Sequence, residues 1–259
     1  MSERKLALVT GASSGIGREI AQLAAADGYD LIVAADETLV DSAAGLAANG
    51  VDVESVEADL STAAGVERLL AAASGRPIDV LVANAGHGLG RGFLDQDVAE
   101  WRHVIDTNIT GTLLLLQPVL KQMAARGQGK VLITGSIAGH LAGSFQAVYN
   151  GSKAFVDSFA AAIGNELKDS GVTITCLKPG PTDTNFFARA GMLDTKVGQS
   201  EKDDPADVAK TGWDAMKDGE HVVVHGLKNK AQVLASGVLS EAQTAEMHRK
   251  QAEPGSGQS

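Results

Sequence analysis

Short apolar runs alternate with longer stretches of helical period along most of the chain. The first run, Leu6 to Thr10, is followed by a helical pattern over Gly15 to Asp27. Most runs are apolar throughout, which is typical of strands that helices cover on both faces. We therefore predict seven strands, at Leu6 to Thr10, Asp30 to Ala35, Val51 to Val56, Ile78 to Ala83, Lys130 to Gly135, Val172 to Lys178 and Glu220 to His225.

The stretches between these strands predict helices. They cover Gly15 to Asp27, Val40 to Asn49, Ala63 to Ser74, Val98 to Arg126 and Ala147 to Ser170. Because crossovers between parallel strands are right-handed, this alternation predicts an α/β fold with a doubly wound, seven-stranded parallel sheet and helices on both faces. We expect a single domain over residues 1–252 and a flexible tail over residues 253–259, whose sequence EPGSGQS resembles a frayed end.

Composition places the chain among folded globular proteins. Of its 259 residues, 44% are hydrophobic and 21% are charged, which excludes a disordered or fibrous chain. The 22 basic and 32 acidic side chains give a net charge of −10, and no Lys/Arg cluster interrupts this balance. Binding to nucleic acid or to an anionic membrane surface is therefore disfavoured, and we expect small molecules or other proteins as partners.

Cysteine content and apolar run length indicate the cellular compartment. The single cysteine, Cys176, cannot form an internal disulfide or a thiolate zinc site. No apolar run approaches the ~20 residues of a spanning helix, and the amino terminus does not have the pattern of a signal peptide. We expect a cytoplasmic protein that does not enter a membrane.

A glycine-rich turn follows the first predicted strand directly. Residues 10–17 read TGASSGIG, and a predicted helix continues from them. Gly11, Gly15 and Gly17 would let a pyrophosphate approach the unpaired N–H groups at the positive end of this helix. The spacing G-x-x-x-G-x-G differs from the commoner G-x-G-x-x-G, and a plain tight turn is the alternative. The position between strand and helix favours the phosphate site.

Further motifs accompany this turn in a fixed order: Asn84-Ala85-Gly86, Ser136 and Tyr149-Asn-Gly-Ser-Lys153. Together they make the chain resemble the short-chain dehydrogenase/reductase family over about residues 5–225. The resemblance implies a Rossmann-like fold and an NAD or NADP cofactor. It also implies an oxidoreductase that interconverts a secondary alcohol and a ketone or aldehyde by hydride transfer.

Tyr149 and Lys153 lie four residues apart at the start of a predicted helix, so their side chains share one helix face. A phenol with a reference pKa of ~10 exchanges protons poorly near neutrality, but an adjacent ammonium favours the phenolate. Tyr149 is thus the candidate general acid/base, although such a pair alone usually just occupies a helix surface. The family pattern implies that Lys153 also binds the nicotinamide ribose and that Ser136 holds the substrate oxygen. It further implies that Asn108 supports a proton relay through water.

The resemblance also implies where the cofactor binds. Asp59 and Leu60 would lie beside the adenine, at a carboxyl strand end where open α/β sheets bind ligands. Pro179 and the residues after it match the family segment that holds the nicotinamide carboxamide. The residues predicted to contact the cofactor are Gly11, Ser13, Ser14, Gly15, Ile16, Gly17, Asp36, Asp59, Leu60, Asn84, Ala85, Gly86, Lys153, Pro179, Gly180, Thr182 and Thr184.

Asp36 follows the second predicted strand, nineteen residues after Gly17, and Glu37 adds a second acid. A carboxylate at this place can accept hydrogen bonds from the adenosine ribose and repels the 2′-phosphate of NADP. It stands one position later than the strand-end Asp of family members that use NAD, and an ordinary solvated turn or cap acid is the alternative. We predict that NAD is preferred and that NADP binds less well.

The substrate side of the site is predicted from residues near the catalytic set. The segment that begins with Phe186 and Phe187 and ends at Leu193 follows the sixth strand. With His140, Leu141, Phe145 and Gln146 it should line the site opposite the cofactor. Because these walls are mainly apolar, we expect a medium-sized, largely apolar carbonyl or alcohol as substrate.

The predicted helix over residues 147–170 carries a second row of small residues, Ala154, Ser158, Ala161 and Asn165. Small side chains permit close helix packing, and this row resembles the paired-helix interface of the family, so we predict a homodimer or homotetramer. The alternative is that the row faces solvent. The segment after His225 departs from the family pattern, which puts the usual tetramer geometry in doubt.

The sequence also offers alternatives to this interpretation. A catalytically silent nucleotide-binding regulator on the same fold stays open, although the set of Ser136, Tyr149 and Lys153 argues against it. A sugar-nucleotide epimerase or dehydratase should carry more residues after the sixth strand. We expect no metal site, because His221 and His225 on a strand lie ~13 Å apart. Ser136 lacks the G-x-S-x-G context of a serine hydrolase.

Overall fold

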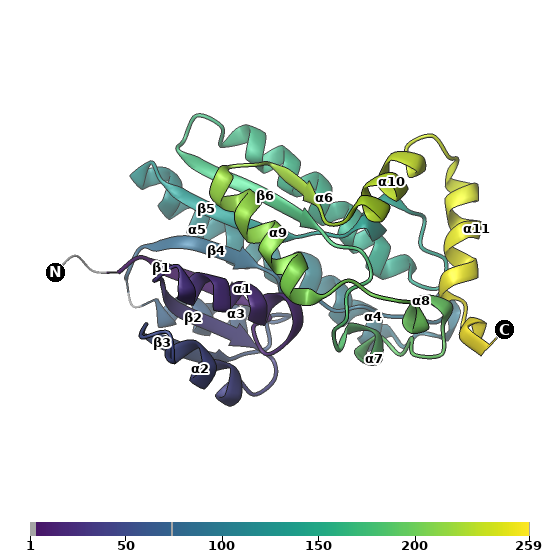
Figure 1. Cartoon of the computed structure of the whole chain (residues 1–259), viewed down its shortest axis with the longest axis horizontal. Helices are drawn as coiled ribbons and strands as arrows, with labels where there is room; N and C mark the ends of the chain where they lie inside the picture. The colour runs from purple at the N-terminus through teal and green to yellow at the C-terminus, as the bar shows by residue number, and fades with distance from the viewer. Residues whose placement is uncertain (1–3, 74, 259) are drawn as a thin grey trace.

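The computed structural model describes residues 4–73 and 75–258, and its centre is a seven-stranded parallel sheet with the order β3-β2-β1-β4-β5-β6-β7 (Figure 1). This confirms the predicted doubly wound sheet, in which the chain reverses its direction of travel across the sheet between β1 and β4. The strands are β1 (Leu6–Thr10), β2 (Asp30–Ala35), β3 (Val53–Glu57), β4 (Ile78–Ala83), β5 (Gly129–Thr134), β6 (Val172–Lys178) and β7 (Val222–Val224).

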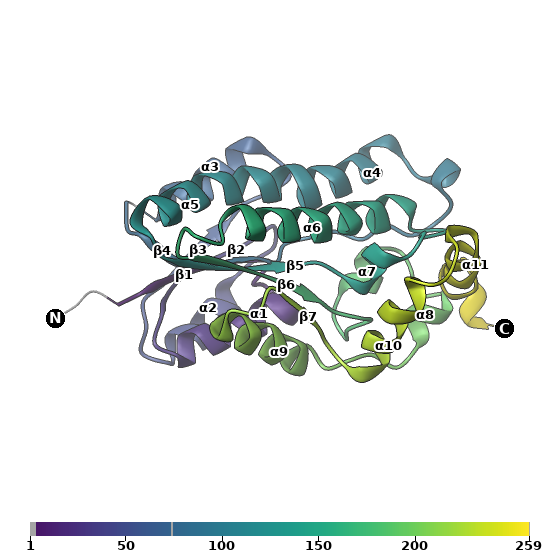
Figure 2. The same cartoon turned by 90° about the horizontal axis from the view of Figure 1, so that it is seen from above.

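Two layers of helices cover the sheet (Figure 2). Successive residues of a strand point to opposite faces, and in β1 Leu8 packs into one hydrophobic core while its neighbour Val9 packs into the other. This explains why most of the strands are apolar throughout; the edge strand β3, with the sequence VESVE, is the exception. One layer contains α3 (Ala63–Ala72), α4 (Val98–Ile105), α5 (Thr112–Arg126) and α6 (Ala147–Glu166), and the other contains α1 (Gly15–Ala26), α2 (Val40–Ala47) and α9 (Pro205–Asp218).

The stretch that forms α9 was not predicted as a helix, and the helix expected over Val98 to Arg126 is not continuous. The structure interrupts it between α4 and α5 with a π-helical segment, Asp106–Gly111. Gly111 has the close approach that only glycine allows, because a Cβ there would lie 1.9 Å from the carbonyl oxygen of Leu60. Such segments frequently mark functional sites, and this one carries Asn108. The predicted helix end at Ser74 lies outside the described residues.

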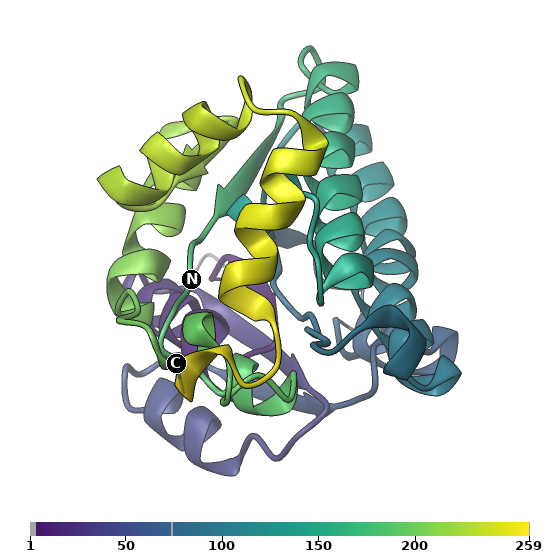
Figure 3. The same ribbon diagram turned by 90° about the vertical axis from the view of Figure 1, so that its right-hand side faces the viewer.

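The carboxyl ends of the strands are covered by segments from the last third of the chain (Figure 1, Figure 3). The side chain of His248 in α11 approaches the loop before α6, where its Nδ1 lies 2.8 Å from the carbonyl oxygen of Ser144. These segments cover the edge of the sheet where a ligand would bind. They are α7 (Phe186–Arg189), α8 (Lys196–Gln199), α10 (Leu227–Ser236) and α11 (Glu241–Ala252).

Residues 253–258 belong to the segment whose composition predicts a flexible tail. They end in a short 3₁₀ helix, Ser256–Gln258, which packs beside α8. Backbone N–H groups of Gly255 and Gly257 donate to the side chain and the backbone of Asp194, at 2.8 and 3.0 Å. These long-range hydrogen bonds hold a sequence that has no strong local preference of its own.

Within residues 4–73 and 75–258, no helix is long and apolar enough to cross a bilayer.

Candidate active site

A cavity of about 990 Å³ opens at the carboxyl ends of the strands, where the chain reverses between β1 and β4. Its size is that of a site for a dinucleotide and a small substrate. Of the residues predicted to contact the cofactor, all except Gly17 line this cavity. Four motifs that lie far apart in the sequence therefore meet in one place.

The glycine-rich turn forms one side of the cavity. Gly11 has a φ of +67°, and a Cβ on it would lie 2.8 Å from Nδ2 of Asn84. Gly17 does not line the cavity; a Cβ there would lie 2.1 Å from the carbonyl oxygen of Gly11, so this glycine lets α1 pack on the turn. The N-cap residue Ser14 makes no side-chain capping hydrogen bond. The start of α1 thus offers backbone N–H donors to an anion, as a pyrophosphate requires.

Asn84 joins three strand ends beneath the cavity. Its Nδ2 donates to the carbonyl oxygens of Thr10 and Gly11 at 3.1 and 3.4 Å, and its Oδ1 accepts from Oγ1 of Thr134 at 3.0 Å. The side chain is therefore engaged by the protein itself. It fixes the edges of β1, β4 and β5 relative to one another, which shapes the floor on which a cofactor would lie.

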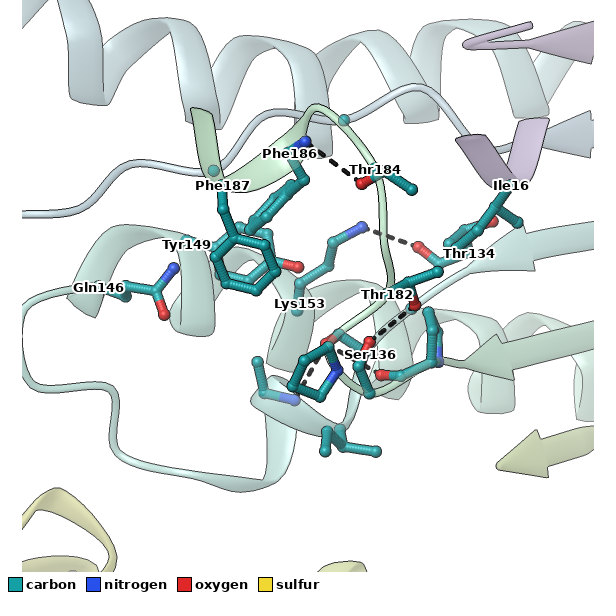
Figure 4. Close-up of a pocket in the computed structure, with 18 of the residues that line it drawn as sticks. Ile16, Thr134, Ser136, Gln146, Tyr149, Lys153, Thr182, Thr184, Phe186 and Phe187 are labelled. Carbon is teal, nitrogen blue, oxygen red and sulfur yellow. Dashed lines mark hydrogen bonds between the residues drawn. The ribbon is translucent and has the colours of Figure 1, made fainter. Parts of the chain in front are cut away.

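The three residues predicted for proton transfer lie on the opposite side (Figure 4). Ser136 follows β5, and its Oγ accepts a hydrogen bond from the backbone N–H of Ala138 at 3.1 Å. Tyr149 lies in the first turns of α6, where its ring packs against Phe186 with centroids 5.1 Å apart. Lys153 extends past it, and its Nζ donates to the carbonyl oxygen of Thr134 at 2.8 Å.

The protonation state of Tyr149 is set mainly by burial. Burial raises its pKa to about 12; a hydrogen bond with the Ser136 side chain opposes this, and the carboxylate of Asp157 adds to it. Lys153 was expected to favour the phenolate of Tyr149, but this effect is not seen. Burial also lowers the pKa of Lys153, and its Nζ donates a hydrogen bond to the carbonyl oxygen of Thr134. The phenol is therefore neutral near pH 7, the form that can donate a proton.

Asn108 does not line the cavity. Its Oδ1 accepts from the backbone N–H of His87 at 2.7 Å, and its Nδ2 donates to the carbonyl oxygen of His87 and to Oγ of Ser152, both at 2.9 Å. The side chain thereby holds the segment after Gly86 against α6. The relay through water that we expected from Asn108 stays a prediction.

Of the residues predicted for the substrate, Gln146, Phe186 and Phe187 line the cavity and His140 does not. His140 ends the 3₁₀ helix Ile137–His140, and its Nε2 lies 2.9 Å from Nζ of Lys178. Burial, together with the charge of Lys178, lowers the pKa of this histidine. The turn after Ser136 directs this side chain to the ion pair of Lys178 and Asp157, and a contact of His140 with the substrate stays a prediction.

The sequence analysis missed two groups of lining residues. Arg189 and His87 line the cavity beside Asp36, at the end expected for the adenosine. The other group comes from α10 and α11 and mixes apolar residues, such as Leu227, Ala231 and Met247, with polar ones. The apolar residues of α10 could have signalled a further helix, but no sequence pattern places it over the catalytic set.

Comparison with known proteins identifies the family. Residues 5–192 match the family model described as short chain dehydrogenase, and the chain belongs to this family of oxidoreductases. It is 33% identical over 226 residues to an uncharacterized oxidoreductase of Staphylococcus saprophyticus, covering 85% of this chain and 94% of that one. It is 34% identical over 222 residues to a 3-oxoacyl-[acyl-carrier-protein] reductase of Vibrio harveyi, covering 80% and 87%.

A solved structure shows the same fold with a cofactor bound. The short-chain dehydrogenase from Sphingobium yanoikuyae in complex with NADPH has a TM-score of 0.81 and is 27% identical to this chain. The match covers 94% of this chain and 99% of that one.

Proposed function

We propose that this chain is a nicotinamide-dinucleotide-dependent oxidoreductase that interconverts a secondary alcohol and a ketone or aldehyde. The observation that carries the proposal is the arrangement of the cavity. Ser136, Tyr149 and Lys153 stand on one side, and the glycine turn at the start of α1 stands on the other. A bound nicotinamide supplies or accepts the hydride.

The protein's own groups supply the proton and the orientation. Ser136 holds the substrate oxygen beside the phenol of Tyr149. In the reducing direction the neutral phenol donates its proton to that oxygen, and in the oxidising direction the phenolate removes it. Lys153 binds the nicotinamide ribose, and the hydrogen bond from its Nζ to the carbonyl oxygen of Thr134 holds the side chain for that contact.

The substrate that fits this cavity is a medium-sized, largely apolar carbonyl or alcohol. Phe186 and Phe187 pack at the catalytic end with ring centroids 5.3 Å apart. Leu227, Ala231 and Met247 add further apolar surface. We also propose that NAD is the preferred cofactor, because Asp36 lines the end of the cavity expected for the adenosine ribose.

The test is a panel of ketones and alcohols graded in size and polarity, assayed with NADH, NADPH and their oxidised forms at the nicotinamide absorbance. We expect turnover of apolar, medium-sized compounds and little turnover of small polyols or charged sugars. Preferential turnover of polyols would refute the proposed substrate class. Binding of a dinucleotide without turnover of any compound in a wide panel would favour a regulatory role on the same fold.

A further inference from the structure

Arg189, the last residue of α7, forms ion pairs with two acids that follow β2. Its Nη2 lies 2.6 Å from Oδ2 of Asp36, and its Nη1 lies 3.3 Å from Oε1 of Glu37. Arg189 is 153 residues away from Asp36 in the sequence. The pair therefore joins the segment after β6, which covers the catalytic end of the cavity, to the end where the adenosine ribose is expected.

His87 completes this group. Its Nε2 lies 3.3 Å from Oδ2 of Asp36 and 2.8 Å from Nη2 of Arg189. The hydrogen bond with His87 and the guanidinium of Arg189 hold the pKa of Asp36 well below its usual range, although partial burial opposes them. Asp36 is thus fully ionised near neutrality, and its charge is compensated within hydrogen-bonding distance.

The compensation changes what Asp36 does to a 2′-phosphate. Alone, Asp36 and Glu37 would present two negative charges to that group, and like charges brought together at a partly buried site weaken binding. With Arg189 paired to both, the three side chains carry a net charge of −1. Asp36 still has lone pairs free to accept hydrogen bonds from ribose hydroxyls, because a carboxylate offers about four acceptor sites.

The other basic residue near the glycine turn does not take this role. Arg18 donates two hydrogen bonds to the carboxylate of its neighbour Glu19, at 2.9 and 3.1 Å, and it does not line the cavity. Arg189 lines the cavity and is 35% exposed, so its guanidinium is accessible from the space that a dinucleotide would fill.

We propose that Arg189 sets the cofactor selectivity of this site by neutralising Asp36, so that NADP binds as a second cofactor that Asp36 alone would exclude. The inference rests on the proposed function, since it concerns the same dinucleotide site. Arg189 belongs to the segment that covers the substrate end of the cavity, yet it acts at the adenosine end of the cofactor. NAD stays the tighter ligand, and Arg189 determines how large the difference is.

Equilibrium binding of NADH and NADPH, followed by nicotinamide fluorescence at one low ionic strength, tests this without any substrate. Arg189→Gln removes the charge and should weaken NADPH binding about tenfold, the scale of a lost charge-assisted interaction, while NADH binds equally or more tightly. Arg189→Lys keeps the charge but not the contacts through two nitrogens, so it should weaken NADPH binding less than Arg189→Gln does. Equal changes for the two dinucleotides, or no change, would overturn the proposal.

A combined variant tests the mechanism. In Asp36→Asn with Glu37→Gln both charges that Arg189 neutralises are absent, so adding Arg189→Gln should change the NADPH to NADH affinity ratio by less than about threefold. Persistence of the full tenfold loss would show that Arg189 acts in some other way and would also overturn the proposal. Lys210→Gln is the control for net charge, because Lys210 is exposed on α9 and pairs with Asp214.

These outcomes are separable from failure of the proposed function. If the wild type bound neither NADH nor NADPH, the proposed function itself would be wrong. If the wild type bound both and the Arg189 variants did not change the ratio, only the role of Arg189 would be wrong.

Discussion

The Nζ atom of Lys153 lies 5.9 Å from the centroid of the Tyr149 ring and donates its hydrogen bond to the carbonyl oxygen of Thr134. The two side chains share one face of α6, as their spacing requires, yet the ammonium does not lower the pKa of the phenol. Burial dominates, so the free protein holds a neutral phenol. The site is thereby prepared to donate a proton to a carbonyl oxygen.

Tyr149→Phe should lower turnover at least about 100-fold on any substrate found in the panel, because only the proton donor is lost while the ring still packs on Phe186. Dinucleotide affinity and thermal stability should change little. Steady-state kinetics, with fluorescence titration and a melting curve as controls, measure all three. Near-normal rates in this variant would refute the role of Tyr149.

The pKa of Tyr149 can be measured directly, because Tyr29 and Tyr149 are the two tyrosines of the chain. Tyrosinate absorbance of the wild type minus that of Tyr149→Phe gives the titration of Tyr149 alone. With a pKa of about 12, this residue should be only about 1% ionised at pH 10, where an ordinary tyrosine is half ionised. Half ionisation at or below pH 10, with circular dichroism showing an intact fold, would contradict the dominance of burial.

Asp27 should contribute to stability through Trp213, the fully buried residue that joins α9 to α1. Nε1 of Trp213 donates to Oδ2 of Asp27 at 2.9 Å, and Asp27→Ala leaves this N–H without its acceptor, at a cost of about 1–2 kcal/mol. Asp27→Asn keeps an acceptor oxygen and should recover most of the loss. Urea denaturation at neutral pH measures these differences.

The pH dependence of this effect has a definite sign. In the folded state the hydrogen bond from Trp213 is the main cause that lowers the pKa of Asp27. The pairing with Lys217 lowers it further. A carboxyl group whose pKa is lower in the folded than in the unfolded state stabilises the fold at pH values above its unfolded-state pKa. This stabilisation is lost as the pH falls through the folded-state pKa. The difference between the wild type and Asp27→Ala should therefore shrink below about pH 4. A constant difference down to pH 3 would contradict this.

The surface formed by α5 and α6 should mediate a two-fold dimer. The row of small residues on α6 is exposed, and beside it Leu114 of α5 and Phe155 of α6 are 41% and 40% exposed. Burying such a patch is the usual reason for association. Sedimentation at micromolar concentration should show a dimer at least, and Phe155→Asp should give a monomer. Val40→Asp, at an exposed apolar position on α2, is the control; a monomeric wild type would exclude this interface.

Local sequence determined much of this protein. The apolar runs predicted the strands because residues of a doubly covered strand pack on helices on both faces. Gly11 was identified by its place between the first strand and the first helix, and the structure gives it a φ of +67°, which glycine adopts readily. The four-residue spacing placed Tyr149 and Lys153 on one helix face. These features depend on neighbours in the sequence, so the sequence alone reveals them.

The tertiary structure decided what depends on distant partners. His140 lies four residues after Ser136, yet it turns to Lys178 because the buried ion pair of Lys178 and Asp157 lies beneath this turn, with their charged atoms 3.1 Å apart. The sequence identified Asp36 by its distance from Gly17. It did not reveal that Arg189 neutralises the charge of Asp36. An ion pair between residues 153 positions apart leaves no periodic signal in the sequence; it exists only because the fold brings the end of β2 and the segment after β6 to the same edge of the sheet.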